Sequence, residues 1–192
     1  IAAKTTGVVT ATLAANSLSN LGALTTASTD VITITVNDGD TDAVTASDLS
    51  TLGGKTAGTV TVTNAVAITG NHDELTAALV TAGTKVVVSN ATVTVNDANT
   101  TAITAAELSA IGGSTTGQVT VTNAVAITGT AAEVTAALVT ADTLVVVDDA
   151  AVTITGNPTI TELNNIAAKT TGVVTATLAA NSLANLGALT TA

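Results

Sequence analysis

The sequence predicts an α/β solenoid, specifically a right-handed parallel β-solenoid with one short helix in each coil of roughly 26–33 residues. First, nearly the same text runs from Val60 to Thr81 and again from Val119 to Thr140. Second, each copy alternates apolar residues with Thr, as a strand does, and then spaces apolar residues four apart, as a helix does. Third, the chain has no Phe, Tyr, Trp, Met or Cys, so its core consists of small apolar side chains that suit a thin, layered interior.

The repeats also predict the domain organisation. Residues 90 to 148 copy residues 31 to 89, and residues 166 to 192 repeat residues 1 to 27 with one difference, Ser19 against Ala184. We therefore expect residues 1–192 to form a single repeat array without caps, cut from something longer. Its coils are expected at approximately residues 1–30, 31–59, 60–85, 86–118, 119–143, 144–172 and 173–192.

The expected elements follow in chain order. Up to residue 59 they are a strand at 7–13, a helical turn at 16–21, a strand at 31–36, a polar turn at 37–42 and a helix starting at 45–48. From residue 60 they are a strand at 60–70 that bends at Asn64, a helix starting at 71–74 and a strand at 85–95. After the duplicated block come strands at 144–154, a turn at 156–158 and a helix starting at 159–162. Glycines that follow the expected helices are typical of C-caps; they are Gly22, Gly53, Gly54, Gly112 and Gly113.

Five helix starts share one arrangement, in which a Thr or Asn stands three residues before an Asp or Glu. The pairs are Thr45 and Asp48, Asn71 and Glu74, Thr104 and Glu107, Thr130 and Glu133, and Thr159 and Glu162. This spacing predicts capping boxes, because the first side chain can accept from the N3 amide while the carboxylate reaches back to the N-cap amide. Local structure alone thus accounts for about a third of the acidic residues.

The spacing of strands and helices leaves two arrangements open. Strands linked by crossovers of this length run parallel. They stack at about 4.8 Å, whereas helix axes need about 8–10 Å. Either the array curves with its helices outside, or each unit holds two strands for every helix, which would make Thr63–Asn64, Ser89–Asn90 and Asp148–Asp149 hairpin turns. We favour stacked coils with closely packed, Ala-rich helices.

Charge and composition argue against several classes of partner. The net charge is −10, with four lysines and no arginine, and nucleic acid is not expected because phosphate binding requires clustered cations. Polar residues and glycines interrupt every apolar run, so no membrane span is expected, and no signal peptide is visible. The absence of cysteine excludes disulfides and thiolate metal sites.

One loop offers a candidate calcium site. Asp38, Asp40 and Asp42 place three carboxylates at alternate positions, which is how short loops gather oxygen ligands around calcium. The loop lacks the distal bidentate Glu of an EF-hand, and its duplicate at 96–101 retains one carboxylate. A solvated turn is the alternative interpretation. Calcium is the only cofactor that the sequence suggests.

The remaining polar residues do not assemble a catalytic centre. His72 is the only histidine and is expected at the surface, inside a helix cap. Asp148–Asp149 stand where the other repeats have bends, and no Ser-His-Asp set can be assembled more than once, so we expect no enzymatic activity.

Threonine pairs recur in almost every repeat, at 33/35, 61/63, 92/94, 120/122, 153/155 and 175/177. Flat Thr arrays resemble the ice-binding faces of insect antifreeze proteins. The alternative is that Thr is simply the usual polar residue on the outer face of a strand.

The chain resembles the Ala/Thr/Val-rich tandem repeats of giant bacterial cell-surface proteins, of the cyanobacterial type, in text such as Val-Thr-Val-Thr-Asn-Ala-Val-Ala-Ile-Thr-Gly at 119–129. It lacks the Gly-Gly-x-Gly-x-Asp repeats of calcium-binding RTX proteins. The resemblance implies an extracellular or cell-surface location and a role in a fibre, sheath or stalk. We expect a structural repeat segment that associates end to end with further copies or continues covalently. A calcium-, glycan- or ice-binding module of a surface adhesin is the alternative.

Overall fold

The computed structural model describes residues 2–143, 145–181 and 183–190. It is a mixed α/β fold in which the described strand pairings are parallel. The chain divides into two compact units, Ile1–Thr94 with Ser114–Gly117 and Val95–Gly113 with Gln118–Ala192. The prediction of parallel strands alternating with short helices is confirmed.

The elements of the first unit are η1 (Ala2–Lys4), β1 (Thr10–Thr12), α1 (Leu18–Leu21), β2 (Val31–Val36), β3 (Ala43–Thr45), α2 (Ala46–Gly53), β4 (Val60–Val62), β5 (Ala67–Gly70), α3 (His72–Leu79) and β6 (Val86–Val88). The strand β7 (Thr92–Val95) passes from the first unit into the second. The elements of the second unit are β8 (Ala102–Thr104), α4 (Ala105–Gly112), β9 (Val119–Val121), β10 (Ala126–Thr130), α5 (Ala131–Leu138), η2 (Ala141–Thr143), β11 (Val145–Val146), β12 (Ala151–Thr155), α6 (Ile160–Ala167), β13 (Val174–Ala176) and α7 (Leu183–Leu186).

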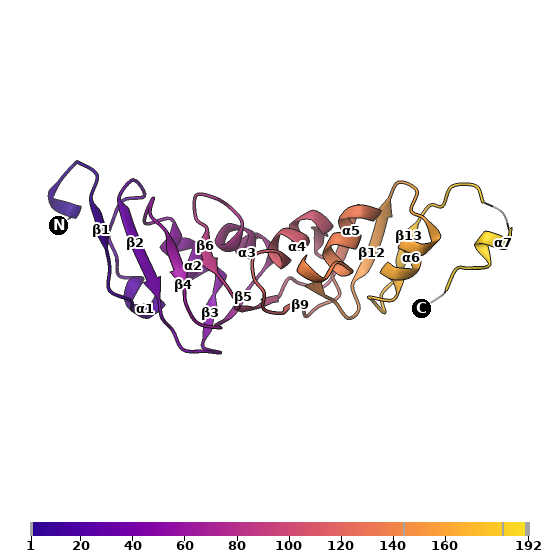
Figure 1. The fold of residues 1–192 in the computed structure, drawn as a ribbon, viewed down its shortest axis with the longest axis horizontal. Helices are drawn as coiled ribbons and strands as arrows, with labels where there is room; N and C mark the ends of the chain where they lie inside the picture. Colours follow the sequence, from indigo (N-terminus) through magenta and orange to yellow (C-terminus); the bar gives the residue numbers. More distant parts are fainter. Residues whose placement is uncertain (1, 144, 182, 191–192) are drawn as a thin grey trace. The chain divides into compact units, whose positions relative to one another are not determined.

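In the first unit, one sheet has the order β1-β2-β4-β6, and these strands lie side by side in Figure 1. Thr12 pairs with Thr33, and Thr35 pairs with Thr61, so like residues stack on like. The strands β3 and β5 pair beside this sheet. Helix α2 packs against α3, which places the helices of successive repeats next to each other.

In the second unit, one sheet has the order β13-β12-β10-β8, in which β8 and β10 correspond to β3 and β5, while the pair β9 and β11 corresponds to β4 and β6. Helix α4 packs against α5, and α5 packs against α6. The sequence duplication is reproduced element by element. For example, β3 and α2 begin at Ala43 and Ala46, and their counterparts β8 and α4 begin at Ala102 and Ala105.

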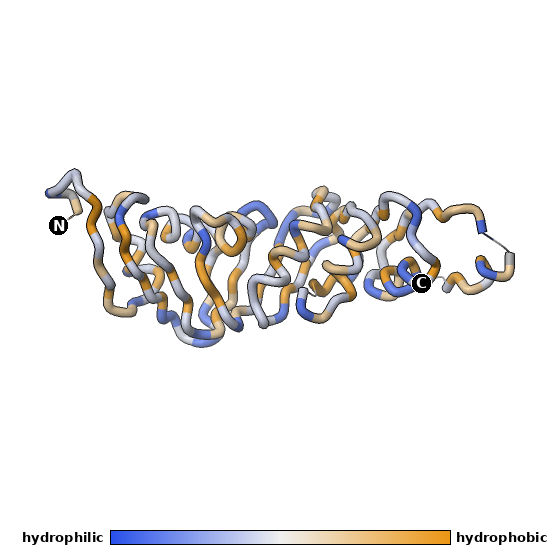
Figure 2. The backbone as a smooth tube through the Cα atoms, turned by 45° about the horizontal axis from the view of Figure 1, so that its top comes forward, coloured by the Kyte–Doolittle hydropathy of each residue, from blue (hydrophilic) through white to orange (hydrophobic). Residues whose placement is uncertain are grey.

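The core of each unit consists of the apolar faces of strands and helices. Along β2, Ile32, Ile34 and Val36 are at most 2 % exposed, whereas Val31 is 40 % exposed. The hydropathy colours of Figure 2 follow this organisation, with hydrophobic stretches along the strands and hydrophilic stretches at bends and on helices. Because burying one such aliphatic side chain stabilises a fold by about 1.5–3 kcal/mol, the core needs no aromatic residue.

Two expectations change in the structure. The hairpin alternative is wrong, because β4 pairs in parallel with β2 and β6, while β5, which follows the bend at Asn64, pairs with β3. The short strands β3 and β8 occupy residues for which the sequence predicts only a turn running into a helix start. The expected coil boundary at residue 144 and the outer ends of the first and last coils lie outside the described residues. None of the described helices has the length and apolar character needed to cross a bilayer.

Candidate functional site

Four strands are preceded by the sequence Thr-x-Gly, and in three of them the Thr hydroxyl binds the backbone of a neighbouring strand or of the residue before it. It occurs at Thr5–Gly7, Thr56–Gly58, Thr115–Gly117 and Thr170–Gly172, ahead of β1, β4, β9 and β13. Sequence reasoning missed this motif, although its recurrence four or five residues before a strand is visible in the sequence.

The first unit shows how the motif works. The hydroxyl of Thr56, which is 4 % exposed, accepts from the amides of Ile32 and Gly58 at 2.8 Å each. The same oxygen lies 2.9 Å from the Asp30 carbonyl and 2.8 Å from the Ile32 carbonyl, to which it can donate. A Cβ on Gly58 would lie 2.3 Å from the Ile32 carbonyl oxygen, so glycine is required for this approach. The side chain of Thr56 thus takes the place of part of the backbone hydrogen bonding between β2 and the segment that leads into β4.

The motif recurs with the same geometry. Thr115 donates to the Ala91 carbonyl at 2.7 Å, and Thr170 donates to the Ala150 carbonyl at 2.6 Å. Both hydroxyls are buried, and each accepts the amide of the glycine two residues later. In the motif before β1, the hydroxyl of Thr5 accepts the Gly7 amide at 3.1 Å but is exposed, because β1 is the edge strand of its sheet.

The acidic loop, residues 37–42, makes a second recurring contact. It is bound to the bend before β5: the Asn64 side-chain amide donates to the Asp38 carbonyl at 2.6 Å, and the Ala65 amide donates to Asp40 Oδ1 at 2.9 Å. The Thr41 amide donates to the Ala65 carbonyl at 2.9 Å, from a left-handed conformation with φ of 66°. Each of these bonds joins the loop to the bend through at least one backbone group, and two of them also need the side chain of Asn64 or Asp40.

The duplicate loop in the second unit repeats these bonds with different chemistry. Asn123 donates to the Asp97 carbonyl at 2.6 Å, and the Ala124 amide donates to Asn99 Oδ1 at 3.1 Å. Thr100 also adopts a left-handed conformation, with φ of 65°. The carboxylate of Asp40 and the amide oxygen of Asn99 therefore do the same work, which explains why the copy tolerates the loss of charge.

The candidate calcium ligands are used as separate hydrogen-bond acceptors. Asp38 Oδ2 accepts from the Leu18 amide at 2.7 Å, and Asp42 Oδ2 accepts from the Gly39 amide at 2.7 Å. Asp40 accepts from Ala65, as described above. Within residues 2–143, 145–181 and 183–190, no group of three or more His, Cys, Asp or Glu side chains could hold a metal ion. The calcium site stays a prediction.

The glycines at the helix ends have a steric role that the C-cap prediction did not include. Gly54 is the C-cap of α2, but its φ is −68°, which any residue can adopt. Gly53 is the last helical residue, and a Cβ there would lie 2.1 Å from the Thr84 carbonyl oxygen. A Cβ on its counterpart Gly112 would lie 2.2 Å from the Thr143 carbonyl oxygen. The first glycine of each pair is required because backbone passes directly over it.

The helix starts confirm the capping prediction. Complete capping boxes form at Asn71, Thr104, Thr130 and Thr159. The shorter Asp48 accepts instead from the Thr45 hydroxyl at 2.7 Å.

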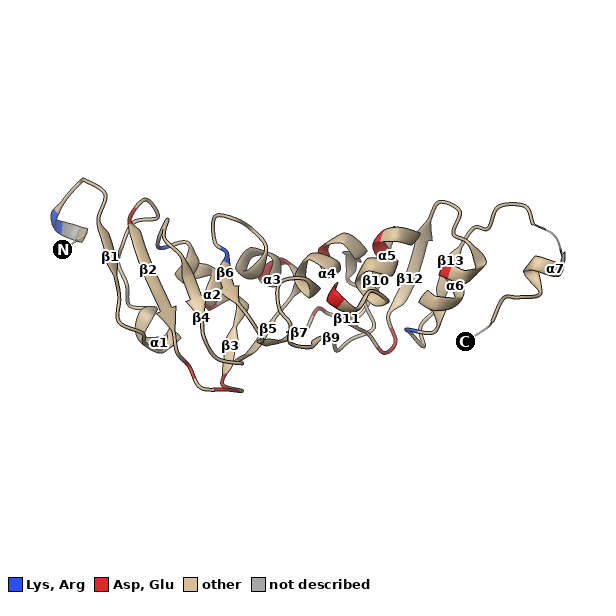
Figure 3. Cartoon of the chain, in the orientation of Figure 1, with Lys and Arg blue, Asp and Glu red and all other residues tan. Residues whose placement is uncertain are grey.

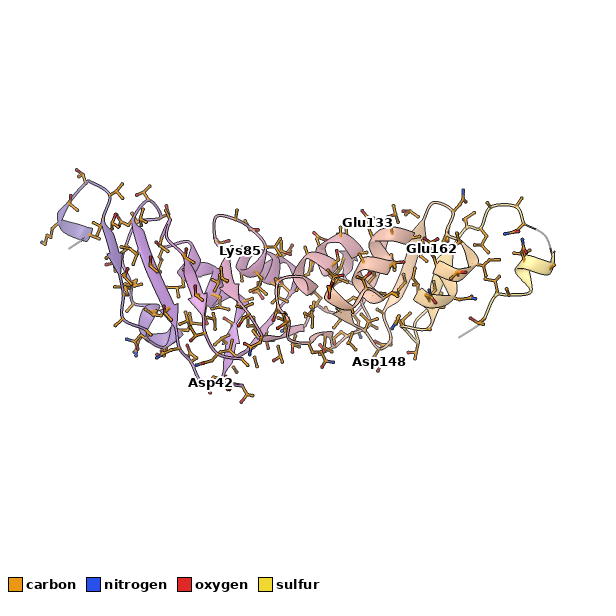
Figure 4. The ribbon with its side chains drawn as sticks, in the orientation of Figure 1. Asp42, Lys85, Glu133, Asp148 and Glu162 are labelled. Carbon is orange, nitrogen blue, oxygen red and sulfur yellow. The ribbon has the colours of Figure 1, made fainter. Side chains whose placement is uncertain are left out.

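Two of these boxes change the pKa of their carboxyl groups. The hydrogen bond from the Thr130 amide, followed by that from the Thr130 hydroxyl, lowers the pKa of Glu133, and Thr159 does the same to Glu162. Figure 4 shows both carboxylates at their helix starts and Asp148 at a bend on the other side of the second unit.

The Thr pairs lie on more than one sheet. In the second unit, one row of Thr side chains runs across neighbouring strands in register and comprises Thr104, Thr128, Thr153 and Thr175. Thr128 is partly buried, and the other three are exposed. In the first unit the rows are shorter and continue into Val87. An ordered Thr row of limited extent is thus present in each unit.

The single histidine lies at the start of α3. The side chain of His72 is 14 % exposed, and its Nε2 lies 3.5 Å from the Asp73 carboxylate, so His72 is partly buried. The other ionisable residues lie mainly at bends and helix starts, as Figure 3 shows. Comparison of the chain with models of known protein families, with curated proteins and with solved structures finds no match.

Proposed function

We propose that this chain is a structural repeat segment of an extracellular fibre, sheath or cell-surface stalk. In this proposal its coils stack as a right-handed parallel β-solenoid with one short helix in each coil, and further copies join end to end or in the same chain. The single observation that carries it is the recurrence of one set of contacts. The Thr-x-Gly motif, the acidic loop and the close-approach glycine each bind neighbouring backbone, and each occurs in both units.

These contacts support an array because they are directed along the direction in which strands stack. Thr56 and Thr115 bind backbone of the adjacent strand rather than a side chain that could vary. In a repeat array, stability is the sum of such nearest-neighbour terms, so the same contacts serve any number of copies. A chain of this composition also offers few cleavage sites to trypsin-like or chymotrypsin-like proteases, since it has four lysines, no arginine and no aromatic residue.

A tandem chain tests the proposal. Because residues 166–192 repeat residues 1–27, a second copy of residues 28–192 can be appended after residue 192 without a linker. Electron microscopy of chains with two, three and four copies should give particles whose length grows in proportion to copy number. The matched control carries a Gly-Ser linker at the same junction. Separate globules joined by flexible segments in both chains would contradict the proposal.

The ordered Thr row favours a second candidate, a binding module of a surface adhesin with ice, glycan or calcium as its ligand. Thr104, Thr128, Thr153 and Thr175 lie in register on four successive strands, which are about 4.8 Å apart in a parallel sheet. Thermal hysteresis of the full chain tests ice binding, with Thr153→Lys as the variant and Thr33→Lys, on the other unit, as the control. Hysteresis that Thr153→Lys alone abolishes would support this candidate. Its absence in the unmodified chain would remove ice.

A further inference from the structure

We propose that the two near-identical terminal segments compete for one binding surface, the edge of β2 that binds residues 1–25, which we call the seat. Residues 166–190 of a second copy would dock there in place of residues 1–25. This inference rests on the proposed function and names the partner and the surface that join separate copies. Its basis is that the structure shows the same segment twice, bound from opposite sides. The N-terminal segment is bound to β2, and the C-terminal segment is bound to β12.

The two segments use different backbone groups. On either side of β1, the Val9 carbonyl accepts from the Val31 amide at 2.8 Å, and the Leu13 amide donates to the Thr33 carbonyl at 3.0 Å. Directly before β13, the Val173 carbonyl accepts from the Val152 amide at 2.9 Å. Along a parallel strand, alternate residues direct their amide and carbonyl groups to opposite neighbours.

The counterparts of these residues show that the two sets do not overlap. Val9 corresponds to Val174, and Leu13 corresponds to Leu178, whereas β12 uses the groups of Val173, the counterpart of Val8. The edge of β13 that faces away from β12 therefore presents the set of groups that β1 uses to bind β2. In the described sheet, β13 is an edge strand.

Besides the backbone hydrogen bonds between strands, the seat on β2 makes polar and apolar contacts with the bound segment. Asp30, which is 4 % exposed, accepts the Val9 amide at 2.8 Å, and the Lys55 ammonium donates to the Gly22 carbonyl at 2.5 Å. Leu21 is 5 % exposed there, whereas its counterpart Leu186 is partly exposed. The C-terminal segment thus carries the residues that the seat binds, but without the apolar cover that the seat provides.

Exchange of the two segments replaces each contact by an equivalent one, as in domain swapping. The equilibrium between the two segments on the seat is then set by chain entropy. Residues 1–25 of the same chain stay bound until the concentration of second copies approaches the effective concentration of the tethered segment, about the millimolar range for a short connection. A substitution that weakens the binding of β1 alone should therefore favour binding of the second copy at the seat.

Proline substitution in the full chain tests this competition. Ala11→Pro removes an amide that β1 directs to β2, and Ala176→Pro removes the corresponding amide of β13 without touching those directed to β12. Sedimentation should show that Ala11→Pro lowers the concentration of half-association about tenfold or more. The double variant should return to the monomer, and Ala11→Val and Ala176→Val are the matched controls. Association of Ala11→Pro that Ala176→Pro leaves unchanged, or no association at all, would overturn the proposal.

A cross-link tests the register independently of folding stability. The chain has no cysteine, and Thr12, which pairs with Thr33, corresponds to Thr177. A mixture of Thr33→Cys and Thr177→Cys chains, each with Ala11→Pro, should form the mixed disulfide. Thr35→Cys in place of Thr33→Cys should not, because it lies two residues out of register. Equal cross-linking of both refutes the joint. If no cross-link forms but the tandem chains grow in proportion to copy number, the docking of a second copy on β2 is refuted and the proposed function is not. If the cross-link is specific but the tandem particles are compact, the proposed function is refuted and the docking is not.

Discussion

Replacing Thr56 by Val should destabilise the first unit far more than its size change suggests. The substitution keeps the shape of the side chain but removes the oxygen that accepts from the Ile32 and Gly58 amides. Each buried amide left without an acceptor costs about 1–3 kcal/mol. With partial relaxation, we expect a loss of about 2–4 kcal/mol in the free energy of unfolding, which corresponds to a fall of roughly 4–16 °C in melting temperature for a chain of this size.

Thermal and urea unfolding followed by circular dichroism measure this effect, since the chain has no Trp or Tyr for fluorescence. Thr56→Ser keeps the hydroxyl and should cost only about 0.8 kcal/mol for the lost methyl group. Thr33→Val, on the exposed face of the neighbouring strand, should change stability by no more than about 0.5 kcal/mol. If Thr56→Val were no less stable than Thr56→Ser, the hydroxyl would not be the bridge between the strands.

Three further predictions follow from the other contacts. Gly53→Ala should destabilise the chain by about 1–3 kcal/mol through overpacking, whereas Gly54→Ala, one residue later, should be neutral or stabilising in the same unfolding assay; equal effects would refute the steric role of the first glycine. Asp40→Asn should leave the melting temperature unchanged in calcium or in chelator, because only a carbonyl-type acceptor is needed there. If calcium raised the melting temperature of the unmodified chain and this variant abolished the rise, the loop would instead be a metal site. Because the folded pKa values of Glu133 and Glu162 are lowered from the ordinary value of 4.5, their stabilisation is present above pH 4.5 and is lost as pH falls through the lowered values. The double Glu→Gln variant should therefore show a shallower loss of melting temperature in acid, and an unchanged acid limb would contradict this.

The local elements could be predicted well from the sequence, because their causes are local. Alternation in Val31–Val36 predicts a half-buried strand, and the structure places β2 at those residues. The capping pairs, such as Thr104 and Glu107, predict helix starts because cap and carboxylate are only three residues apart. The polar turn at 37–42 was also evident. Its bonds to Asn64 and Ala65 were not, since they join residues about 25 positions apart.

By itself, the sequence determined the repeat, the parallel strands, the helix caps and the aliphatic core, since each follows from residue spacing and composition. Only the tertiary structure decided which strand pairs with which, and thus that Thr56 lies against Ile32 and that Gly53 lies beneath the Thr84 carbonyl. It also decided that β1 and β13 use alternate groups of one segment. The physical reason is that a hydrogen bond or a steric limit between distant residues depends on register, and register is set by the packing of whole strands rather than by any stretch of sequence read alone.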